Sequence, residues 1–329
     1  MKRVLIIQTA FLGDVILATA LAETLHHVYP EAKIDMLVKK QNASLFDNHS
    51  FLYQVLTLDK KNGKFKEIRA LMKEIRANSY DAVVNVHRFF SSGFLTAFSG
   101  AAIRSGFSKN PFSLFFTHKA QHTIDNTHEI ERNLRLLSFV GVDKTLMPAL
   151  YPSKSDFEHT SQFKKKPYIC IAPASVWFTK QYPHEQWVKF IKMLSPELNI
   201  FLLGGKGDEE FCQNIFSESA HPGVLSLCGK LSLLQTAALM KDAQMNYVND
   251  SAPLHISSAM NAPVTAIFCS TVPSFGFGPL STDALIVETL DELICRPCGL
   301  HGHKQCPEKH FKCAYTIDNQ ILVTRTSQN

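Results

Sequence analysis

The chain has 329 residues, of which 45% are hydrophobic and 19% charged, and its formal net charge is +5. This balance excludes an intrinsically disordered chain, and the length suffices for two domains with full hydrophobic cores. The mild positive charge fits an anionic substrate or contact with an anionic membrane surface. Without an arginine-rich helix or a ribbon of basic and aromatic residues, the charge does not indicate nucleic-acid binding.

The sequence predicts neither a transmembrane helix nor a signal peptide. No run of about 18 apolar residues is present. The apolar run at residues 4–7 stops at Gln8, Asp14 interrupts the next apolar stretch, and no small-residue cleavage site closes it. We therefore expect a cytoplasmic protein, whose basic surface would allow peripheral contact with the inner face of the cytoplasmic membrane.

Four cysteines stand alone in apolar or helical surroundings and are predicted to be reduced thiols in a reducing compartment: Cys170, Cys212, Cys228 and Cys269.

In the first part of the chain, short apolar runs alternate with amphipathic segments. Strands are predicted at residues 4–7, 34–38, 55–58 and 82–86, and helices at residues 14–27, 64–77 and 128–140. In the first helix, Leu17, Leu21 and Leu25 share one face. This order is typical of a parallel sheet covered by helices on both faces.

The alternation stops and then restarts, which predicts two domains. Residues 147–167 hold three prolines and little periodicity, as expected of a linker. Strands are then predicted at residues 168–172, 200–203, 224–227, 245–248 and 264–268, with helices at residues 184–194, from about 208, 231–241 and 251–260. We expect an α/β chain of two doubly wound, Rossmann-like domains, residues 1–150 and 151–329, facing a cleft.

Ligands of open parallel sheets bind beyond the carboxyl ends of the strands, so the loops after strands are the places to search. The dinucleotide fingerprint G-x-G-x-x-G and the P-loop pattern are both missing, which argues against classical dehydrogenases and P-loop kinases.

The first such loop ends in Gly13 and Asp14. Gly13 can take backbone angles that other residues avoid, and Asp14 begins the predicted helix. Asp14 is either a helix cap or a general base that removes a proton from an attacking hydroxyl.

Basic residues near other strand ends of the first domain could bind an anionic acceptor. His87 and Arg88 follow the predicted strand at residues 82–86, and Arg88 is the strongest candidate. The weaker candidates, which are more often merely solvated, are Arg104, Lys60, Lys61 and Lys64.

In the second domain, the loop after the strand at residues 168–172 carries Ser175, Thr179 and Lys180. An ammonium and two hydroxyls suit the binding of a phosphate, although Lys180 could also be an ordinary surface lysine.

Two further loops of the second domain have polar candidates. After the strand at residues 245–248, Asp250 and Ser251 precede a helix with an early proline, whose N-terminus would bind a diphosphate and which His255 follows by one turn. After a glycine-rich strand end, Asp208 and Glu209 could hold ribose hydroxyls. A purely structural role explains either loop as well: a capped helix, and a turn leading into acidic first-turn residues.

A cluster of cysteines lies near the C-terminus. Their spacing permits a structural zinc site, and reduced thiols packed near the cleft are the alternative, for Cys295, Cys298, Cys306 and Cys313.

Taken together, these loops resemble the ADP-heptose:lipopolysaccharide heptosyltransferase family. The resemblance spans nearly the whole chain and is carried by four motifs in order: Arg3-Val4-Leu5-Ile6-Ile7 with Gly13-Asp14-Val15, His128-Glu129-Ile130-Glu131-Arg132-Asn133-Leu134, Ala172-Pro173-Ala174-Ser175 with Lys180, and Asn249-Asp250-Ser251 with His255.

The resemblance implies a GT-B fold with an acceptor domain followed by a donor domain. It implies an inverting, metal-independent transfer of heptose from ADP-heptose to the lipopolysaccharide inner core, without a cofactor. By position, Asp14 is similar to the family's base and Lys180 to its donor-phosphate residue. Asp250, Ser251 and His255 are similar to its donor-binding helix start, and Asp208 or Glu209 to its ribose contact. Two alternatives stay open: a sugar-nucleotide epimerase of the same shape, and a non-catalytic nucleotide-sugar binding protein.

Overall fold

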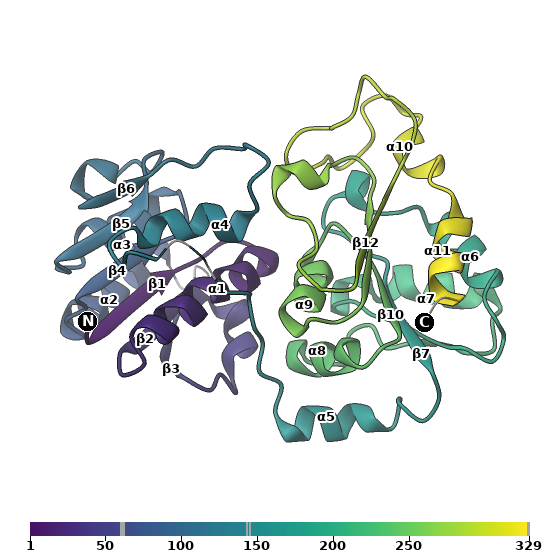
Figure 1. Cartoon of the computed structure of the whole chain (residues 1–329), viewed down its shortest axis with the longest axis horizontal. Helices are drawn as coiled ribbons and strands as arrows, with labels where there is room; N and C mark the ends of the chain where they lie inside the picture. The colour runs from purple at the N-terminus through teal and green to yellow at the C-terminus, as the bar shows by residue number, and fades with distance from the viewer. Residues whose placement is uncertain (60–62, 143, 145, 328–329) are drawn as a thin grey trace. The chain divides into compact units, whose positions relative to one another are not determined.

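A computed structural model of the chain describes residues 1–59, 63–142, 144 and 146–327. The chain divides into two compact units, Met1–Tyr151 and Pro152–Asn329 (Figure 1). None of the helices within the described ranges is long and apolar enough to cross a membrane.

The first unit is built on a parallel sheet in which every pairing runs in the same direction. Its order among the described residues is β3-β2-β1-β4-β5-β6. The strands are β1 (Arg3–Ile7), β2 (Lys33–Lys39), β3 (Leu52–Leu58), β4 (Ala82–Asn85), β5 (Ile103–Phe107) and β6 (His118–Ala120). The central strands β1 and β4 are almost wholly buried, as expected of a parallel sheet that is covered on both faces.

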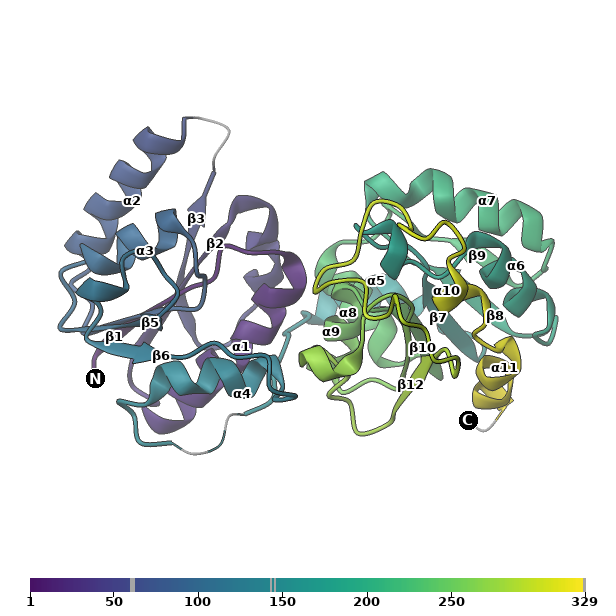
Figure 2. The ribbon, with the colours of Figure 1, turned by 90° about the horizontal axis from the view of Figure 1, so that it is seen from above.

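Helices cover both faces of this sheet (Figure 2). The helices are α1 (Leu12–Val28), α2 (Lys64–Ala77), α3 (Phe90–Ala97) and α4 (Glu129–Leu134), with 3-10 turns η1 (Lys40–Phe46), η3 (Ser113–Phe115) and η4 (Arg135–Leu137). Helix α2 buries only a stripe, Ile68, Leu71 and Ile75, against the core that β1 and β4 share with α3. Helices α1 and α4 pack against each other on the opposite face, and α1 is buried along most of its length.

The second unit repeats this architecture. Its sheet has the order β12-β11-β10-β7-β8-β9 within the described residues and is again parallel throughout. The strands are β7 (Tyr168–Ala172), β8 (Asn199–Leu202), β9 (Val224–Ser226), β10 (Met245–Asn249), β11 (Val264–Phe268) and β12 (Ala284–Glu288). Counted from its own first strand, each sheet has the order 3-2-1-4-5-6 of doubly wound nucleotide-binding folds.

The helices of the second unit also lie on two faces (Figures 1 and 2). They are α5 (Lys154–Ser161), α6 (His184–Lys192), α7 (Glu209–Ser219), α8 (Leu233–Lys241), α9 (Ala252–Met260), α10 (Lys312–Tyr315) and α11 (Asn319–Ser327), with 3-10 turns η5 (Phe178–Lys180), η6 (Lys206–Asp208) and η7 (Pro273–Phe275). Helices α6, α7 and α11 share one core with the sheet, centred on the fully buried Trp187 and Tyr182. Helices α8 and α9 pack together on the other face.

The predicted α/β class is confirmed, but three segment predictions need correction. The proposed linker at residues 147–167 contains helix α5, which packs against α8. Just beyond the C-terminal ends of these two helices, Lys164 and Asp242 form an ion pair at 2.6 Å. The helix predicted at residues 128–140 ends at Leu134 and continues only as a 3-10 turn. Elements absent from the prediction are α3, β5, β6, β12, α10 and α11.

Candidate functional site

The strand order places most of the predicted site residues at one point in each sheet. The order reverses between β1 and β4 in the first unit and between β7 and β10 in the second. Ligands of open α/β sheets bind beyond the carboxyl ends of the strands at such a reversal. The segments that directly follow these four strands hold Gly13 and Asp14 in the first turn of α1, His87 and Arg88, Ser175 to Lys180, and Asp250 and Ser251.

Asp14 lies in the first turn of α1, two residues after the helix begins. The N-cap is Phe11, whose backbone N–H donates to the Asp14 carboxylate at 3.2 Å. The prediction that the helix starts at Asp14 is therefore wrong by two residues. Gly13 lies within α1 and has no positive φ, so it does not use the backbone angles that are open to glycine. Asp14 keeps a half-buried carboxylate with one oxygen outside this capping bond.

The surroundings of Asp14 tune it toward proton transfer. Burial, followed by the negative charge of Glu129, raises the pKa of Asp14 to about 6. The Phe11 N–H bond and the positive charge of Arg88 act in the opposite direction but are outweighed. A carboxylate with a pKa close to working pH is suited to act as a general base.

A series of hydrogen-bonded polar side chains extends from Arg88 into the first unit. Arg88 Nη1 and His122 Nδ1 are 3.1 Å apart, and His122 Nε2 and the Glu129 carboxylate are 3.3 Å apart. Because a guanidinium only donates, His122 accepts at Nδ1 and donates from Nε2 to Glu129. The fully buried Arg132 donates to the same Glu129 oxygen at 2.8 Å. Burial by itself would raise the pKa of Glu129, but the His122 hydrogen bond and the Arg132 charge together lower it.

The roles of His122, Glu129 and Arg132 were not predicted from the sequence. The signal available was an acidic and a basic residue three positions apart at a helix start, Glu129 and Arg132, which the structure joins as an i,i+3 pair. His122 gave no local signal, because its partner Arg88 is 34 residues away.

His87 is held beside the carboxyl end of β1. Its Nδ1 lies 2.8 Å from the hydroxyl of Thr9, the second residue after β1, and its ring packs edge-on against Phe89 at 4.6 Å. The structure thus places His87 and Arg88 after the carboxyl end of β4, the strand end at which the sequence predicted them. It commits Arg104 elsewhere, since that guanidinium donates to the backbone carbonyls of Ala101 and Phe115.

The remaining weak candidates of the first domain cannot be placed. Lys60 and Lys61 lie outside the described residues, as does the side chain of Lys64.

In the second unit, Lys180 and Asp250 form an ion pair across the reversal point. Lys180 Nζ lies 2.6 Å from Asp250 Oδ2, and both side chains are largely buried. The hydroxyl of Thr271 donates to the same Asp250 oxygen at 2.6 Å. Asp250 therefore positions the Lys180 ammonium, a role that the sequence did not assign to it.

The loop that carries Lys180 is held in place by contacts with Gly302 and His303 of the C-terminal segment. Thr179 is buried, and its hydroxyl accepts hydrogen bonds from the His303 backbone N–H at 2.7 Å and the Ser270 hydroxyl at 3.0 Å. Gly302 crosses so closely that an added Cβ would lie 2.9 Å from Thr179 Oγ1 and 3.0 Å from Lys180 Cγ. Thr179 is thus a supporting residue of the loop, and its predicted contact with a donor phosphate is not favoured.

Helix α9 directs its N-terminus to the same edge of the sheet. Ser251 is its N-cap and makes no side-chain capping bond, while Pro253 occupies the first turn. The positive end of the helix dipole suits an anion at this position. His255 is buried near Phe277, with ring centroids 6.3 Å apart, so it lies inside the unit.

Asn249 ties this helix start to the lysine loop. Its buried side chain accepts from the Tyr182 backbone N–H at 2.9 Å and donates to the Pro173 carbonyl at 2.7 Å. These bonds join the ends of β7 and β10, a connection that the sequence did not predict.

The other donor-site candidates lie near these strands and differ in their exposure and in their hydrogen bonds. Ser175 is half-buried, and its backbone N–H donates to the Gln181 side chain at 3.2 Å. The Asp208 carboxylate accepts from the Gly205 backbone N–H at 2.8 Å, as the structural alternative for this loop required. Glu209 is exposed at the start of α7 and lies against Gly229.

The cysteines differ from the prediction in one pair. Cys212 in α7 and Cys228 after β9 form a disulfide, so the expectation of reduced thiols is wrong for these two, whereas Cys170 and Cys269 are free and buried. The packing of α7 beside β9 brings the two Cα atoms within 6.7 Å.

The C-terminal cysteines are free thiols gathered around one small pocket together with His310: Cys295, Cys298, Cys306 and Cys313. Among the described residues, no group of three or more His, Cys, Asp or Glu side chains is arranged to hold a metal ion. A structural zinc site and reduced thiols both stay predictions for this cluster.

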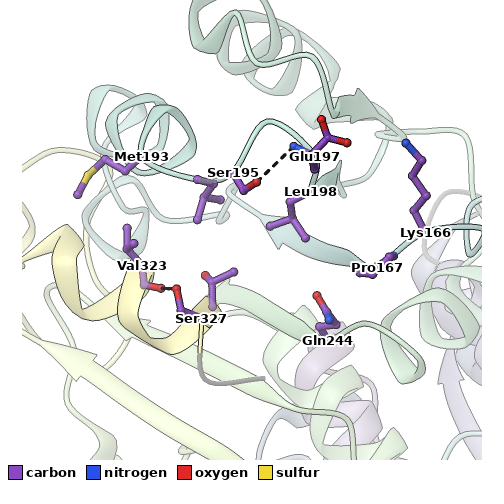
Figure 3. A pocket seen from close by; sticks show the side chains of 11 residues that line it. Lys166, Pro167, Met193, Ser195, Glu197, Leu198, Gln244, Val323 and Ser327 are labelled. Atoms are coloured by element: carbon purple, nitrogen blue, oxygen red, sulfur yellow. Dashed lines mark hydrogen bonds between the residues drawn. The ribbon is translucent and has the colours of Figure 1, made fainter.

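A separate pocket of about 460 Å³ opens at the opposite edge of the second sheet (Figure 3). Lys166 and Pro167 precede β7, Leu198 precedes β8 and Gln244 precedes β10, so the pocket lies at the amino ends of the strands. None of the predicted site residues that the structure describes lines it.

Comparison with known proteins finds similar chains. Residues 68–312 match the model of glycosyltransferase family 9 (heptosyltransferase). Lipopolysaccharide heptosyltransferase 3 of Escherichia coli is 26% identical over 279 residues, which are 79% of this chain and 82% of that protein.

Solved structures share the fold. E. coli ADP-heptose lps heptosyltransferase II has a TM-score of 0.82 at 21% identity and covers 100% of this chain and 98% of its own. E. coli heptosyltransferase WaaC with ADP has a TM-score of 0.70 at 21% identity, covering 86% of this chain and 92% of its own. These likenesses confirm the predicted GT-B fold class. Because the family match extends over more than half of its length, the chain belongs to glycosyltransferase family 9, the heptosyltransferase family.

Proposed function

We propose that the protein is an inverting transferase that moves heptose from ADP-heptose to the inner core of lipopolysaccharide without a metal ion. The observation that carries the proposal is the Asp14 carboxylate, whose pKa burial raises to about 6 at the point where the first sheet reverses its strand order. The family match and the names of the relatives support the donor and the acceptor class.

In the proposed reaction the first unit binds the acceptor and the second binds the donor. An acceptor hydroxyl gives its proton to Asp14 while its oxygen forms a bond to the anomeric carbon of the heptose. The bond from that carbon to the diphosphate oxygen breaks, and ADP leaves with the electron pair. Attack opposite the leaving group inverts the anomeric configuration.

The leaving diphosphate gains negative charge, and the second unit offers groups to stabilise it. The Lys180 ammonium, held by Asp250 at 2.6 Å, lies at the same strand ends as the N-terminus of α9 beyond Ser251. Oriented cations and helix N–H groups of this kind replace the charge that a metal supplies in other transferases. Ser175, Asp208, Glu209 and His255 stay candidate donor contacts, and His87 and Arg88 candidate acceptor contacts with Gly13.

The test is incubation of the purified protein with ADP-heptose, with and without a deacylated core acceptor, in chelator-treated buffer. We expect ADP release and a new glycosidic bond only when the acceptor is present. Donor conversion without acceptor would identify an epimerase. ADP binding without any turnover would identify a binding protein.

The Asp14→Asn variant tests the base directly. We expect turnover to fall by about 10²- to 10⁴-fold, the usual contribution of a general base, while ADP affinity stays nearly unchanged. The matched control is Asp47→Asn, because Asp47 is an exposed aspartate of the same unit. Turnover of Asp14→Asn close to that of the control would show that another group takes the proton.

A further inference from the structure

A surface of the first unit combines exposed aromatic residues with unpaired cations. Helices α2 and α3 lie side by side there (Figure 2). We call it the α2–α3 face, and it comprises Phe65, Lys66, Arg69, Met72, Lys73 and Arg76 of α2, Phe90, Phe94 and Phe98 along α3, and Phe112, Leu114 and Phe115 after β5.

A groove of about 750 Å³ runs along this face. Its floor is apolar, since Met72 and Phe94 pack against the core of the unit from outside. Its rim is cationic and contains Lys66, Arg69 and Lys73, and no acidic side chain among the described residues lines it. A groove of this kind suits an amphiphile whose charged part is negative.

Helix α2 separates its charges onto two flanks. Lys66, Arg69 and Lys73 recur at helical spacing and form no ion pair with any residue in the described ranges. The acidic residues of the helix are engaged on its other flank, where the Glu67 carboxylate accepts from the Asp59 backbone N–H and the Glu74 carboxylate from the Gln54 side chain. The positive charge of the groove is therefore not neutralised within this helix.

The aromatic part of the face is contiguous, and its side chains are half-buried or exposed. Phe90, Phe94 and Phe98 recur every four residues, and Phe112 contacts all three with ring centroids 4.9–6.0 Å apart. At the margins, Phe65 is 85% and Leu114 is 87% exposed. Large contiguous apolar patches are rare on soluble surfaces and mark protein or membrane contacts.

We propose that the α2–α3 face binds the surface of an anionic lipid bilayer. Aromatic and aliphatic side chains such as Phe65 and Leu114 would enter the headgroup region, and Lys66, Arg69 and Lys73 would contact lipid phosphates. A second copy of the chain fits less well, because a symmetric contact would bring two cationic rims together.

The position of the face relates it to the acceptor candidates. Helices that follow strands of a parallel sheet begin at the carboxyl edge of that sheet, where Asp14 and Arg88 lie. Phe65 is in the first turn of α2 and Phe90 begins α3, so the aromatic residues start at this edge. Membrane binding here would hold the proposed acceptor site close to lipid-borne acceptors. The binding itself does not depend on the proposed function.

The test is cosedimentation of the full chain with vesicles of phosphatidylcholine alone and with roughly 30% phosphatidylglycerol. We expect wild-type binding to the anionic vesicles, weakened when NaCl is raised from about 0.1 M to about 0.5 M. K66Q/R69Q/K73Q should reduce partitioning by about 100-fold, at about fivefold for each basic residue. F65S/L114S should reduce it by at least about tenfold, because two apolar anchors are lost.

The matched control is K165Q/K166Q/K192Q, which removes the same charge from exposed lysines of the second unit and should stay within about threefold of wild type. No wild-type binding to anionic vesicles would overturn the proposal, as would an equal loss in the control. A dimer in sedimentation velocity that F65S/L114S dissociates would identify a second copy as the occupant and also overturn it.

Transfer to a deacylated, water-soluble acceptor, measured in parallel, separates the two proposals. We expect all of these variants to transfer normally to the soluble acceptor. Vesicle binding without transfer by any variant would refute the proposed function and leave the membrane face standing.

Discussion

Replacing Asp14 with asparagine should make the first unit more stable at neutral pH while it removes the proposed base. The pKa of this carboxyl rises from 3.8 to about 6, chiefly through burial. At about 1.4 kcal/mol per pKa unit, the ionised carboxylate then costs the folded state up to about 3 kcal/mol at pH 7. The side chain is only half-buried and its bond from Phe11 can survive in asparagine, so we expect a gain of about 2 kcal/mol.

The sign of this effect gives it a pH signature. A raised folded-state pKa means that stability is fully present below the unfolded pKa and is lost as pH rises through about 6. Asp14→Asn should therefore gain about 2 kcal/mol at pH 7 and well under 1 kcal/mol near pH 3, where the carboxyl is largely protonated in both states.

Hydrogen exchange measures this gain in the correct unit. Exchange at the backbone amides of β1 and α1 reports opening of the first unit, with variant and wild type compared at the same pH. Both tryptophans, Trp177 and Trp187, belong to the second unit, so their fluorescence is an internal control that should not change. An unchanged or lower stability of Asp14→Asn at pH 7 would refute the argument from burial.

Three further predictions concern the site and the disulfide. Because Asp14 must be ionised to act as a base, kcat/KM should fall tenfold per pH unit below about pH 6. Arg88→Gln removes a positive charge that lowers the Asp14 pKa, so this variant should move the midpoint of the pH profile upward. A midpoint near pH 4 in both proteins would contradict the assignment of Asp14 as the base. Lys180→Gln should lower kcat by about 10²- to 10³-fold, and Asp250→Asn should lower it by less. Because both residues act through the Lys180 ammonium, the double variant should be no less active than Lys180→Gln alone. Additive losses would show that Asp250 has a separate role. The Cys212–Cys228 disulfide links residues 16 positions apart, so its reduction should lower the free energy of unfolding of the second unit by about 3 kcal/mol, measured by tryptophan fluorescence. A C212S/C228S variant should have the same stability with and without reductant. No effect of reductant on the wild type would contradict the disulfide.

The parts of the fold that the sequence predicted are those with strong local signals. Buried strands such as β1 and β7 are essentially continuous apolar runs, and the polar residues that follow them were found because ligands bind at carboxyl strand ends. The family motifs then identified Asp14, Lys180 and Asp250 as a set.

The missed elements lack such signals. Strand β5 contains Arg104, Ser105 and Gly106, and β6 has only three residues, so neither forms an apolar run. Helix α3 includes Gly93, a poor helix former, which is needed because a Cβ there would lie 1.9 Å from the Asn110 side chain.

The remaining contacts that the sequence did not predict join residues on different elements of the fold. The bond between Arg88 and His122, the support of Thr179 by His303 and the Cys212–Cys228 disulfide each join residues whose proximity depends on how whole elements pack. Periodicity predicts which face of an element is buried, but it does not tell which side chain on another element that face will meet.

The close crossing of Gly302 over Thr179 and Lys180 also bears on how the protein is made. Residues leave the ribosome in order, so the strand and loop that carry Lys180 emerge more than a hundred positions before the segment that fastens them. The second unit therefore completes the edge that carries Lys180 only near the end of translation. A chain that stops before Gly302 contains every residue of the candidate site, but it lacks the backbone contacts of Gly302 and His303 that position the Lys180 loop.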